Sequence, residues 1–257
     1  QEITGRCVLH DIFNEVLVLD KFQGEAGICH MYDYGVDEEN YYIVMKRYKC
    51  SLRQWRLSDN QPLHAQLPLY LHIFKMVLRL VCYLHSHSVT HCDLKCDNIL
   101  LEYEESASKG KGQQRAEDTT SPFAVVLADF GESLIQNPAQ DQDQTAEAPR
   151  DQAVAMHSGF TARGRGTECI RSPEMLAAFK KDGDRRKRGQ PLKTDVWSLG
   201  CLLYELLTTE FLFLETSYMK FWNRVCAPAV PALGEEHRAK LGQCQLLLDL
   251  LDFILVK

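Results

Sequence analysis

The chain has 257 residues, of which 45% are hydrophobic, so it can bury a large core and form one large domain or two small ones. Its 29 basic and 35 acidic residues give a net charge of −6, which argues against a nucleic-acid-binding surface. Ten cysteines without a C-x-x-C pair, and no charged-then-apolar leader, favour a reducing intracellular compartment, either cytoplasmic or nuclear.

The first 48 residues predict a helix followed by a β-hairpin. Four apolar residues are spaced to share one helix face: Val8, Ile12, Val16 and Leu19. Glu15 lies beside that face. Two strand-like segments follow at 27–34 and 41–48, and the polar residues 37–40 join them as a turn.

Two predicted helices lead to the first polar motif. A short helix starts at 51–55, and a longer one at 69–85 is apolar on nearly every side, as in a helix buried within a larger domain. Next comes His-Cys-Asp-Leu-Lys-Cys-Asp-Asn at 91–98, followed by an apolar run. This short turn carries a carboxylate that can accept a proton, a fixed cation, and an amide oxygen suited to a hard metal ion.

Three further motifs follow in order. Ala-Val-Val-Leu at 124–127 predicts a buried strand, and Ala-Asp-Phe-Gly follows it at 128–131. Gly-Thr-Glu-Cys-Ile-Arg-Ser-Pro-Glu occupies 166–174, and Thr-Asp-Val-Trp-Ser-Leu-Gly occupies 194–200.

Two apolar helices are expected in the last quarter of the chain. We predict that Asp195 caps a helix over 196–207 and that another helix covers 246–255. The first of these is too short, and too interrupted by Glu205, to span a bilayer. We therefore expect a soluble protein with no membrane contact.

Together these motifs resemble a eukaryotic protein kinase of the serine/threonine type. The first is similar to the catalytic loop H-R-D-L-x-x-x-N, the second contains the metal-binding Asp-Phe-Gly, and the others resemble the A-P-E element and the D-V-W-S-L-G helix start. The resemblance implies an α+β, protein-kinase-like two-lobe fold. It divides the chain into a partial β-rich N-lobe at 1–48, with helix C, strands 4 and 5 and the hinge, and a helical C-lobe at 49–257.

The resemblance also implies an activity, the transfer of the ATP γ-phosphoryl group to Ser or Thr of protein substrates with ATP and Mg²⁺ as cofactors. Asp93 would orient the substrate hydroxyl and accept its proton, while Lys95 would steady the transferring phosphoryl group. Asn98 and Asp129 would hold the magnesium ions. Thr167 would hydrogen-bond the catalytic loop, and together with Lys95 it favours serine/threonine over tyrosine specificity.

Five residues match nucleotide-binding positions of the family. Glu15 falls where the helix-C glutamate pairs with the strand-3 lysine that holds the ATP phosphates; the alternative is an exposed helical glutamate. Met45 matches the residue at the back of the adenine pocket. Lys46 and Tyr48 match the hinge whose backbone binds the adenine edge, and Leu100 is assigned to the same site.

His91 invites two interpretations. It could be a catalytic base, but in kinases the matching residue packs in an internal hydrophobic spine, and we favour that structural role. Phe130, Met31 and Leu19 would complete the spine.

Three insertions near 102–122, 136–163 and 180–190 interrupt the family pattern. The first two are polar and we expect them to be partly disordered. The activation segment, which includes the second insertion, offers four candidate phosphoacceptors: Ser133, Thr145, Ser158 and Thr161. The third carries six cations within 180–188 and is either a nuclear-localisation or docking patch or, more commonly, a solvated loop.

Two departures from the family pattern bear on regulation. Cys92 replaces the arginine that commonly grips a phosphorylated activation segment, and Ile170 replaces a tyrosine near the peptide-binding floor. We expect a protein substrate and regulatory protein partners.

The rival hypothesis is a catalytically silent pseudokinase acting as a scaffold, but a scaffold needs none of Asp93, Asn98 and Asp129. Transfer to a small molecule is a third reading, which the Ser-Pro-Glu and D-V-W-S-L-G elements disfavour.

One expectation concerns the extent of the chain. The family places its glycine-rich loop and its ATP-binding lysine upstream of the glutamate matched by Glu15. Counting back from Glu15 runs past Gln1, so we expect a fragment that, as given, binds ATP weakly and transfers phosphate poorly.

Overall fold

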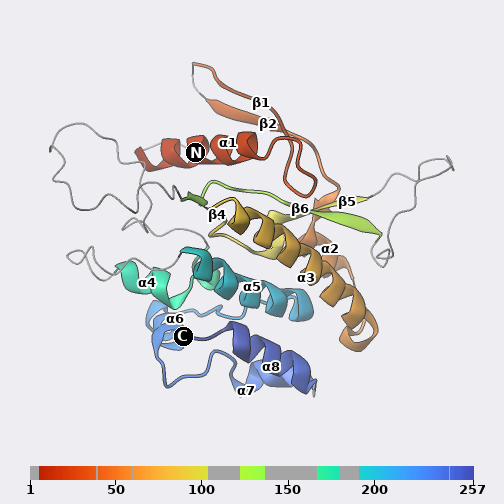
Figure 1. Ribbon diagram of the computed structural model, residues 1–257. Helices are drawn as coiled ribbons and strands as arrows, with labels where there is room; N and C mark the ends of the chain where they lie inside the picture. The colour runs from red at the N-terminus through yellow and green to blue at the C-terminus, as the bar shows by residue number, and fades with distance from the viewer. Residues whose placement is uncertain are drawn as a thin grey trace.

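A computed structural model describes residues 6–38, 40–59, 61–103, 122–136, 167–179, 191–242 and 244–257 (Figure 1). A helix and a β-hairpin lie at one end of the molecule, a small sheet lies in the middle, and helices fill the rest (Figure 1). This is the mixed α+β, two-lobe arrangement that the motifs predict. Most of the three predicted insertions, with Thr145, Ser158, Thr161 and the basic run, lie outside the described residues.

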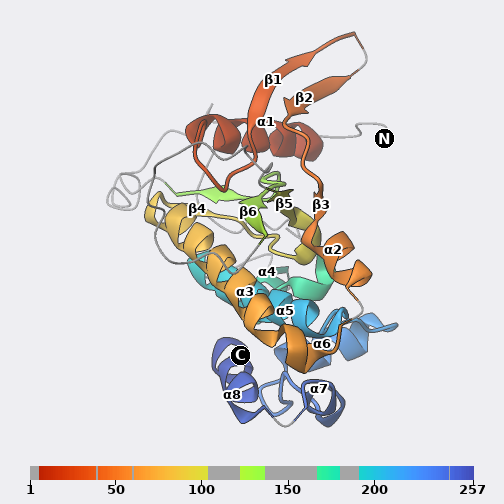
Figure 2. The same cartoon turned by 90° about the vertical axis from the view of Figure 1, so that its right-hand side faces the viewer.

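Helix α1 (Arg6–Lys21) and the hairpin of β1 (Met31–Val36) and β2 (Tyr41–Met45) confirm the pattern predicted at the N-terminal end. The helix buries Val16, Val18 and Leu19, and the hairpin projects beyond it (Figure 2). Polar turn residues close the hairpin, since the Asn40 N–H donates to Asp37 Oδ1 at 2.7 Å.

The central sheet places two of the motifs side by side. Strands β3 (Cys50–Ser51), β5 (Ile99–Tyr103) and β6 (Phe123–Leu127) form an antiparallel sheet in the order β3-β5-β6. The first residue of β5, Ile99, pairs with the last residue of β6, Leu127. The loop before β5 and the Asp-Phe-Gly after β6 therefore emerge at the same end of the sheet. A second antiparallel pair, β4 (Val89–Thr90) and β7 (Leu134–Ile135), flanks this end.

Helices α2 (Leu52–Ser58) and α3 (Leu63–Ser86) follow the hairpin. Ser51 caps α2 in a reciprocal capping box with Gln54, which is why the helix starts there. Within the described residues, α3 alone is long and apolar enough to cross a bilayer, a test that the core helices of water-exposed domains also pass. Here α3 packs against α5, β4 and β6. It buries six side chains: Tyr70, Ile73, Phe74, Val77, Val81 and Leu84.

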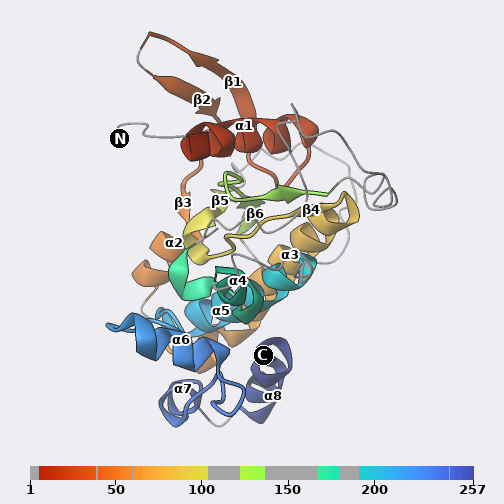
Figure 3. The same ribbon diagram turned by 90° about the vertical axis from the view of Figure 1, so that its left-hand side faces the viewer.

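Helix α5 (Pro191–Thr208) lies at the centre of the helical part, packed between α3 and α8 (Gln245–Ile254). Helix α4 (Pro173–Phe179) lies near its start, and α6 (Tyr218–Cys226) and α7 (Glu235–Lys240) lie with α8 on the side away from the sheet (Figure 3). Gly200 lets α8 come close, because a Cβ there would lie 2.7 Å from Leu255 Cδ2. The predicted helix at the C-terminal end is confirmed as α8.

The predicted cap at Asp195 is wrong. Helix α5 begins at Pro191, so Asp195 lies inside the helix and is fully buried. Proline is favoured in the first turn because it fixes φ and has no N–H to leave unsatisfied there. That start signal outweighs the capping propensity of the aspartate.

Candidate active site

The loop at 91–98 lies between β4 and β5, and helix α5 fixes its first residues. The buried Asp195 carboxylate accepts hydrogen bonds from the His91 N–H and the Cys92 N–H, each at 2.8 Å. His85 Nε2 also contacts Asp195 Oδ2 at 2.8 Å. Cys92 has a φ of 67°, a left-handed conformation that a non-glycine residue keeps only when its surroundings hold it. Asp195 supplies that restraint.

The His91 side chain is enclosed by the core. It is fully buried, its Nε2 contacts the Ala128 carbonyl oxygen at 3.1 Å, and its ring centroid lies 5.0 Å from that of Phe130. Leu19 and Met31 belong to the same buried cluster. This geometry favours the packing role over a catalytic base, because the ring has no open path to a substrate.

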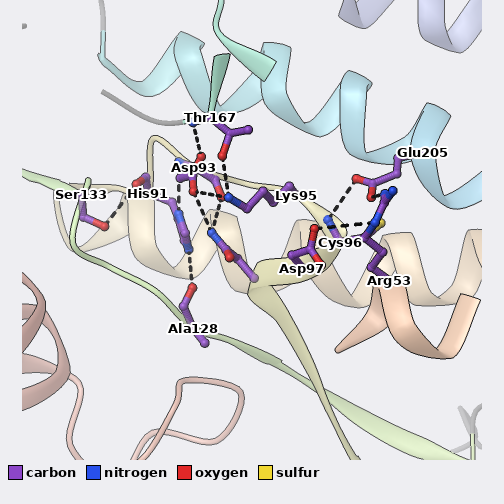
Figure 4. A network of polar contacts seen from close by, with 11 residues as sticks. Arg53, His91, Asp93, Lys95, Cys96, Asp97, Ala128, Ser133, Thr167 and Glu205 are labelled. Atoms are coloured by element: carbon purple, nitrogen blue, oxygen red, sulfur yellow. Dashed lines mark hydrogen bonds and ion pairs between the residues drawn. The ribbon is translucent and has the colours of Figure 1, made fainter. Parts of the chain in front are cut away.

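Asp93 is the centre of the polar network in Figure 4. Its Oδ1 accepts a hydrogen bond from the Thr167 N–H at 2.6 Å, and its Oδ2 accepts from Lys95 Nζ and Asn98 Nδ2, each at 2.9 Å. Lys95 Nζ also donates to the Thr167 hydroxyl. Burial alone would raise the pKa of Asp93, but the hydrogen bonds from Lys95 and Thr167 hold it below its usual value. The carboxylate therefore stays ionised at neutral pH.

Asn98 and Asp129 bring oxygen atoms to the same end of the sheet. The Asn98 amide nitrogen donates to Asp93 O and Oδ2, each at 2.9 Å, so its amide oxygen is the atom it can offer a cation. The Ala128 N–H donates to the Asn98 carbonyl at 3.0 Å, which sets the exposed Asp129 beside this turn. Asp129 has a left-handed φ of 64°.

The donor set fits Mg²⁺. That ion binds through one or two protein oxygens plus phosphate and water, rather than in a cage of protein ligands.

Glu15 faces this site from α1. Its carboxylate accepts a hydrogen bond from the Phe130 N–H. The pKa of Glu15 is raised to about 7, mainly by burial and to a smaller extent by repulsion from the Asp129 carboxylate. The alternative of an exposed helical glutamate is therefore wrong. Two carboxylates held this close also make the site favourable for a cation.

A family model for the protein kinase domain matches residues 3–240. The chain belongs to the protein kinase family. It is 43% identical over 265 residues to a probable serine/threonine-protein kinase of Dictyostelium discoideum, covering 99% of this chain and 10% of that protein.

Other similarities are more distant. The mouse dual specificity protein kinase TTK is 28% identical, covering 74% of this chain and 18% of that protein. The serine/threonine-protein kinase PknD of Chlamydia trachomatis is 26% identical, covering 82% of this chain and 22% of that protein. A crystal structure of the Rad53 kinase domain with SCD2 has a TM-score of 0.61 and 19% identity, covering 95% of this chain and 70% of the other, which shows the shared fold. The kinase chain thus spans from a tenth to about a fifth of the length of these curated relatives.

Three of the nucleotide-site positions gather around the Cys29 thiol. Its sulfur lies 3.7 Å from the Met45 sulfur. The Tyr48 hydroxyl, which accepts from the His30 N–H at 3.1 Å, and the Glu15 carboxylate both affect the pKa of this thiol. Burial, followed by the charge of Glu15, raises the pKa of Cys29 to about 11, so this thiol stays protonated. Glu15, Met45 and Tyr48 therefore lie on one wall of the kinase.

The remaining two positions lie differently. The Lys46 ammonium forms an ion pair with Glu102, and the Lys46 backbone N–H donates to the His30 carbonyl at 2.8 Å. The side chain is thus turned to β5, and the backbone N–H is already bonded within the chain. Leu100 is half-buried in β5, where it pairs with Val126 of β6 and Ser51 of β3.

Ser133, one of the predicted phosphoacceptors, is buried, and its hydroxyl donates to the His91 carbonyl at 3.2 Å. In this structure it is not available to a second kinase, so that prediction is wrong.

The structure also shows site residues that the motifs did not single out. Arg53 of α2 pairs with the buried Glu205 of α5 and lies 3.8 Å from Asp97, and Glu205 accepts from the Cys96 N–H at 3.2 Å (Figure 4). Asn14 reaches the Asp-Phe-Gly segment from α1. The contacts of Arg53 and those of Asn14 both join residues that are distant in sequence, so no local spacing predicts them.

Proposed function

We propose that this chain is the catalytic region of an ATP-dependent protein kinase that transfers the γ-phosphoryl group to Ser or Thr of proteins. The observation that supports it most strongly is the Asp93 carboxylate, kept ionised and oriented by Lys95, Asn98 and Thr167. Phosphoryl transfer requires mainly the positioning of groups and the neutralisation of charge, and this network supplies both.

Each side chain would have a separate task. Asp93 accepts a hydrogen bond from the substrate hydroxyl and takes its proton late in transfer, while the adjacent Lys95 ammonium stabilises negative charge on the incoming phosphoryl group. Asn98 and Asp129 hold Mg²⁺ through their side-chain oxygens. When bound, ATP supplies the phosphoryl group and Mg²⁺ neutralises charge on the phosphates. Glu15, Met45, Lys46, Tyr48 and Leu100 form the nucleotide side of the site.

Serine/threonine specificity is part of the proposal. It is supported by the contact between Lys95 and Thr167, and by the names of the Dictyostelium and Chlamydia relatives. The partners would be protein substrates and regulatory proteins, with neither nucleic acid nor membrane. The proposed location is the cytoplasm or the nucleus.

The second candidate is a catalytically silent pseudokinase that acts as a scaffold. The retention of Asp93, Asn98 and Asp129 argues against it, because a scaffold needs none of them.

The deciding experiment is label transfer from γ-labelled Mg-ATP to a mixed peptide library by the full-length gene product. We expect label on phosphoserine and phosphothreonine. Label on phosphotyrosine alone would contradict the assigned specificity. No transfer by a folded, full-length protein would overturn the kinase activity and favour the scaffold.

A further inference from the structure

The Asn14 side chain joins helix α1 to the segment that carries Asp129. Its amide nitrogen lies 3.0 Å from the Phe130 carbonyl oxygen, 3.3 Å from that of Gly131 and 2.7 Å from that of Ser133. These partners are 116 to 119 residues away along the chain. Asn14 is 8% exposed, so its amide is almost removed from water. A buried amide that donates to three carbonyl oxygens within four residues fixes the path of that backbone.

Asn14 and Glu15 bind the two peptide groups on either side of the Phe130 Cα, one as a donor and the other as an acceptor. Asn14 donates to the Phe130 carbonyl, while Glu15 accepts from the Phe130 N–H. Both polar groups of the residue after Asp129 are thereby held by consecutive side chains of one helix. Ser133 ties the far end of the segment to the catalytic loop, through its bond to the His91 carbonyl.

The restraint matters because Asp129 is in a conformation that it would not adopt alone. Its φ of 64° lies in the left-handed region, and such a residue persists only where its neighbours hold it. The bonds from Asn14 begin at the next residue, so they act on the backbone that aims the Asp129 carboxylate. Residues that hold a metal ligand in this way typically affect metal affinity or activity about 10- to 100-fold.

We propose that Asn14 is a positioning residue that sets the orientation of Asp129 toward the metal-nucleotide site. The inference rests on the proposed function for the identity of the ligand. The chemistry specifies an amide: aspartate at this position would set a carboxylate against three carbonyl oxygens, and leucine would leave those carbonyls without a donor.

The test compares Asn14→Leu and Asn14→Asp with Val18→Ala in the full-length protein. Val18 is fully buried on the same helix, so its truncation destabilises α1 without removing a bond to the Asp129 segment. The first readout is the Mg²⁺ concentration needed for half-maximal binding of a fluorescent ATP analogue. The second is amide hydrogen exchange at residues 130–133. Neither readout requires transfer.

We expect both Asn14 variants to need about 10-fold more Mg²⁺ and to exchange faster at 130–133, while Val18→Ala changes neither beyond its effect on global stability. An unchanged Mg²⁺ requirement in Asn14→Leu, or the same rise in Val18→Ala, would overturn the proposal. If the wild type binds the analogue with Mg²⁺ but transfers nothing, a weakened Mg²⁺ response in Asn14→Leu still supports the role of Asn14, and only the proposed activity fails. A folded wild type without Mg²⁺-dependent binding would contradict both.

Discussion

At the scale of single residues, the site depends on the side chains around Asp93 more than on Asp93 alone. A carboxylate only 5% exposed would normally resist ionisation. Lys95, Asn98 and Thr167 offset that penalty with direct hydrogen bonds, and they come from the catalytic loop and from the start of the 3₁₀ turn at Glu168–Ile170. The same bonds fix which way the two oxygens point.

Asp93→Asn tests this arrangement. Asparagine keeps the shape but cannot take a proton, so we expect the transfer rate to fall by about 10²- to 10⁴-fold. The fold should persist, because Lys95 keeps its bond to the Thr167 hydroxyl. The rate with Mg-ATP and a peptide substrate, together with a thermal unfolding curve, provides the measurement. Asp20→Asn, at an exposed position of α1, is the control, and undiminished transfer by Asp93→Asn would refute its role as the base.

Some residues of this site can be predicted from local spacing in the sequence, and others cannot. Asp93, Lys95 and Asn98 share one turn, so their spacing alone predicts that they meet. Thr167 comes 74 residues after Asp93, and only the order of the family motifs places it there. Asn14 carries no signal, since an asparagine in a helix usually faces water and its three partners are backbone atoms.

At the scale of elements, helix α5 acts as the base on which the catalytic loop is built. Asp195 near its start binds the backbone of His91 and Cys92, and Glu205 near its end binds that of Cys96. One rigid helix therefore holds the loop at both ends. Burial raises the pKa of Glu205, an effect that the hydrogen bonds from Cys96 and Arg53 oppose.

Asp195→Asn should damage stability and activity together. Asparagine offers one acceptor oxygen where aspartate offers two, and its NH₂ would face a backbone N–H. A buried donor left without a partner costs about 1–3 kcal/mol. We expect urea unfolding to show a loss of this size, with a lower transfer rate as the loop relaxes. Val196→Ala, at a half-exposed neighbour on the same helix, should change stability far less. Equal stabilities of Asp195→Asn and the wild type would contradict this account.

Local sequence patterns predict most helices and the hairpin, but they do not predict which distant strands pair. The periodicity of α1 and α8 and the alternation of the hairpin are properties of adjacent residues, so both helices and the hairpin are confirmed. The pairing of β5 with β6 joins strands separated by the insertion near 102–122, and it becomes predictable only through the family resemblance. The start of α5 also escapes the local pattern, because the apolar run begins at Val196 whereas the helix begins at Pro191.

At the scale of the whole molecule, one continuous apolar core runs from Val16 of α1 to Leu255 beyond α8, so the site is supported from both sides. Charged groups gather at the far end of the helical part, around α6 and α7. Arg224 of α6 pairs with Glu215 and Glu236. It also contacts the buried His237 ring at 2.8 Å. Stability at this end therefore depends on the protonation of one histidine.

Acidification should weaken the fold through His237. Its Nδ1 accepts from the Gly234 N–H at 3.1 Å, so the buried ring must be neutral at that atom. Burial, followed by the Arg224 cation, lowers the pKa of His237 below 6.5, and Lys240 acts in the same sense while Glu236 and Glu210 oppose it. The unfolded chain then binds a proton more readily than the folded one. The stability is complete above the unfolded pKa and declines as pH falls through it.

We therefore expect His237 to lower the free energy of unfolding, measured in urea, as the pH falls from 7.5 to 5.5, against the opposite contribution of Glu15, whose raised pKa stabilises the fold on acidification. His237→Asn keeps an acceptor near the Gly234 N–H but cannot be protonated, so its free energy of unfolding should fall less, or rise more, than that of the wild type over this range. The comparison of slopes isolates His237, because every other titrating group is common to both proteins. Parallel slopes in the variant and the wild type would show that His237 does not couple folding to pH.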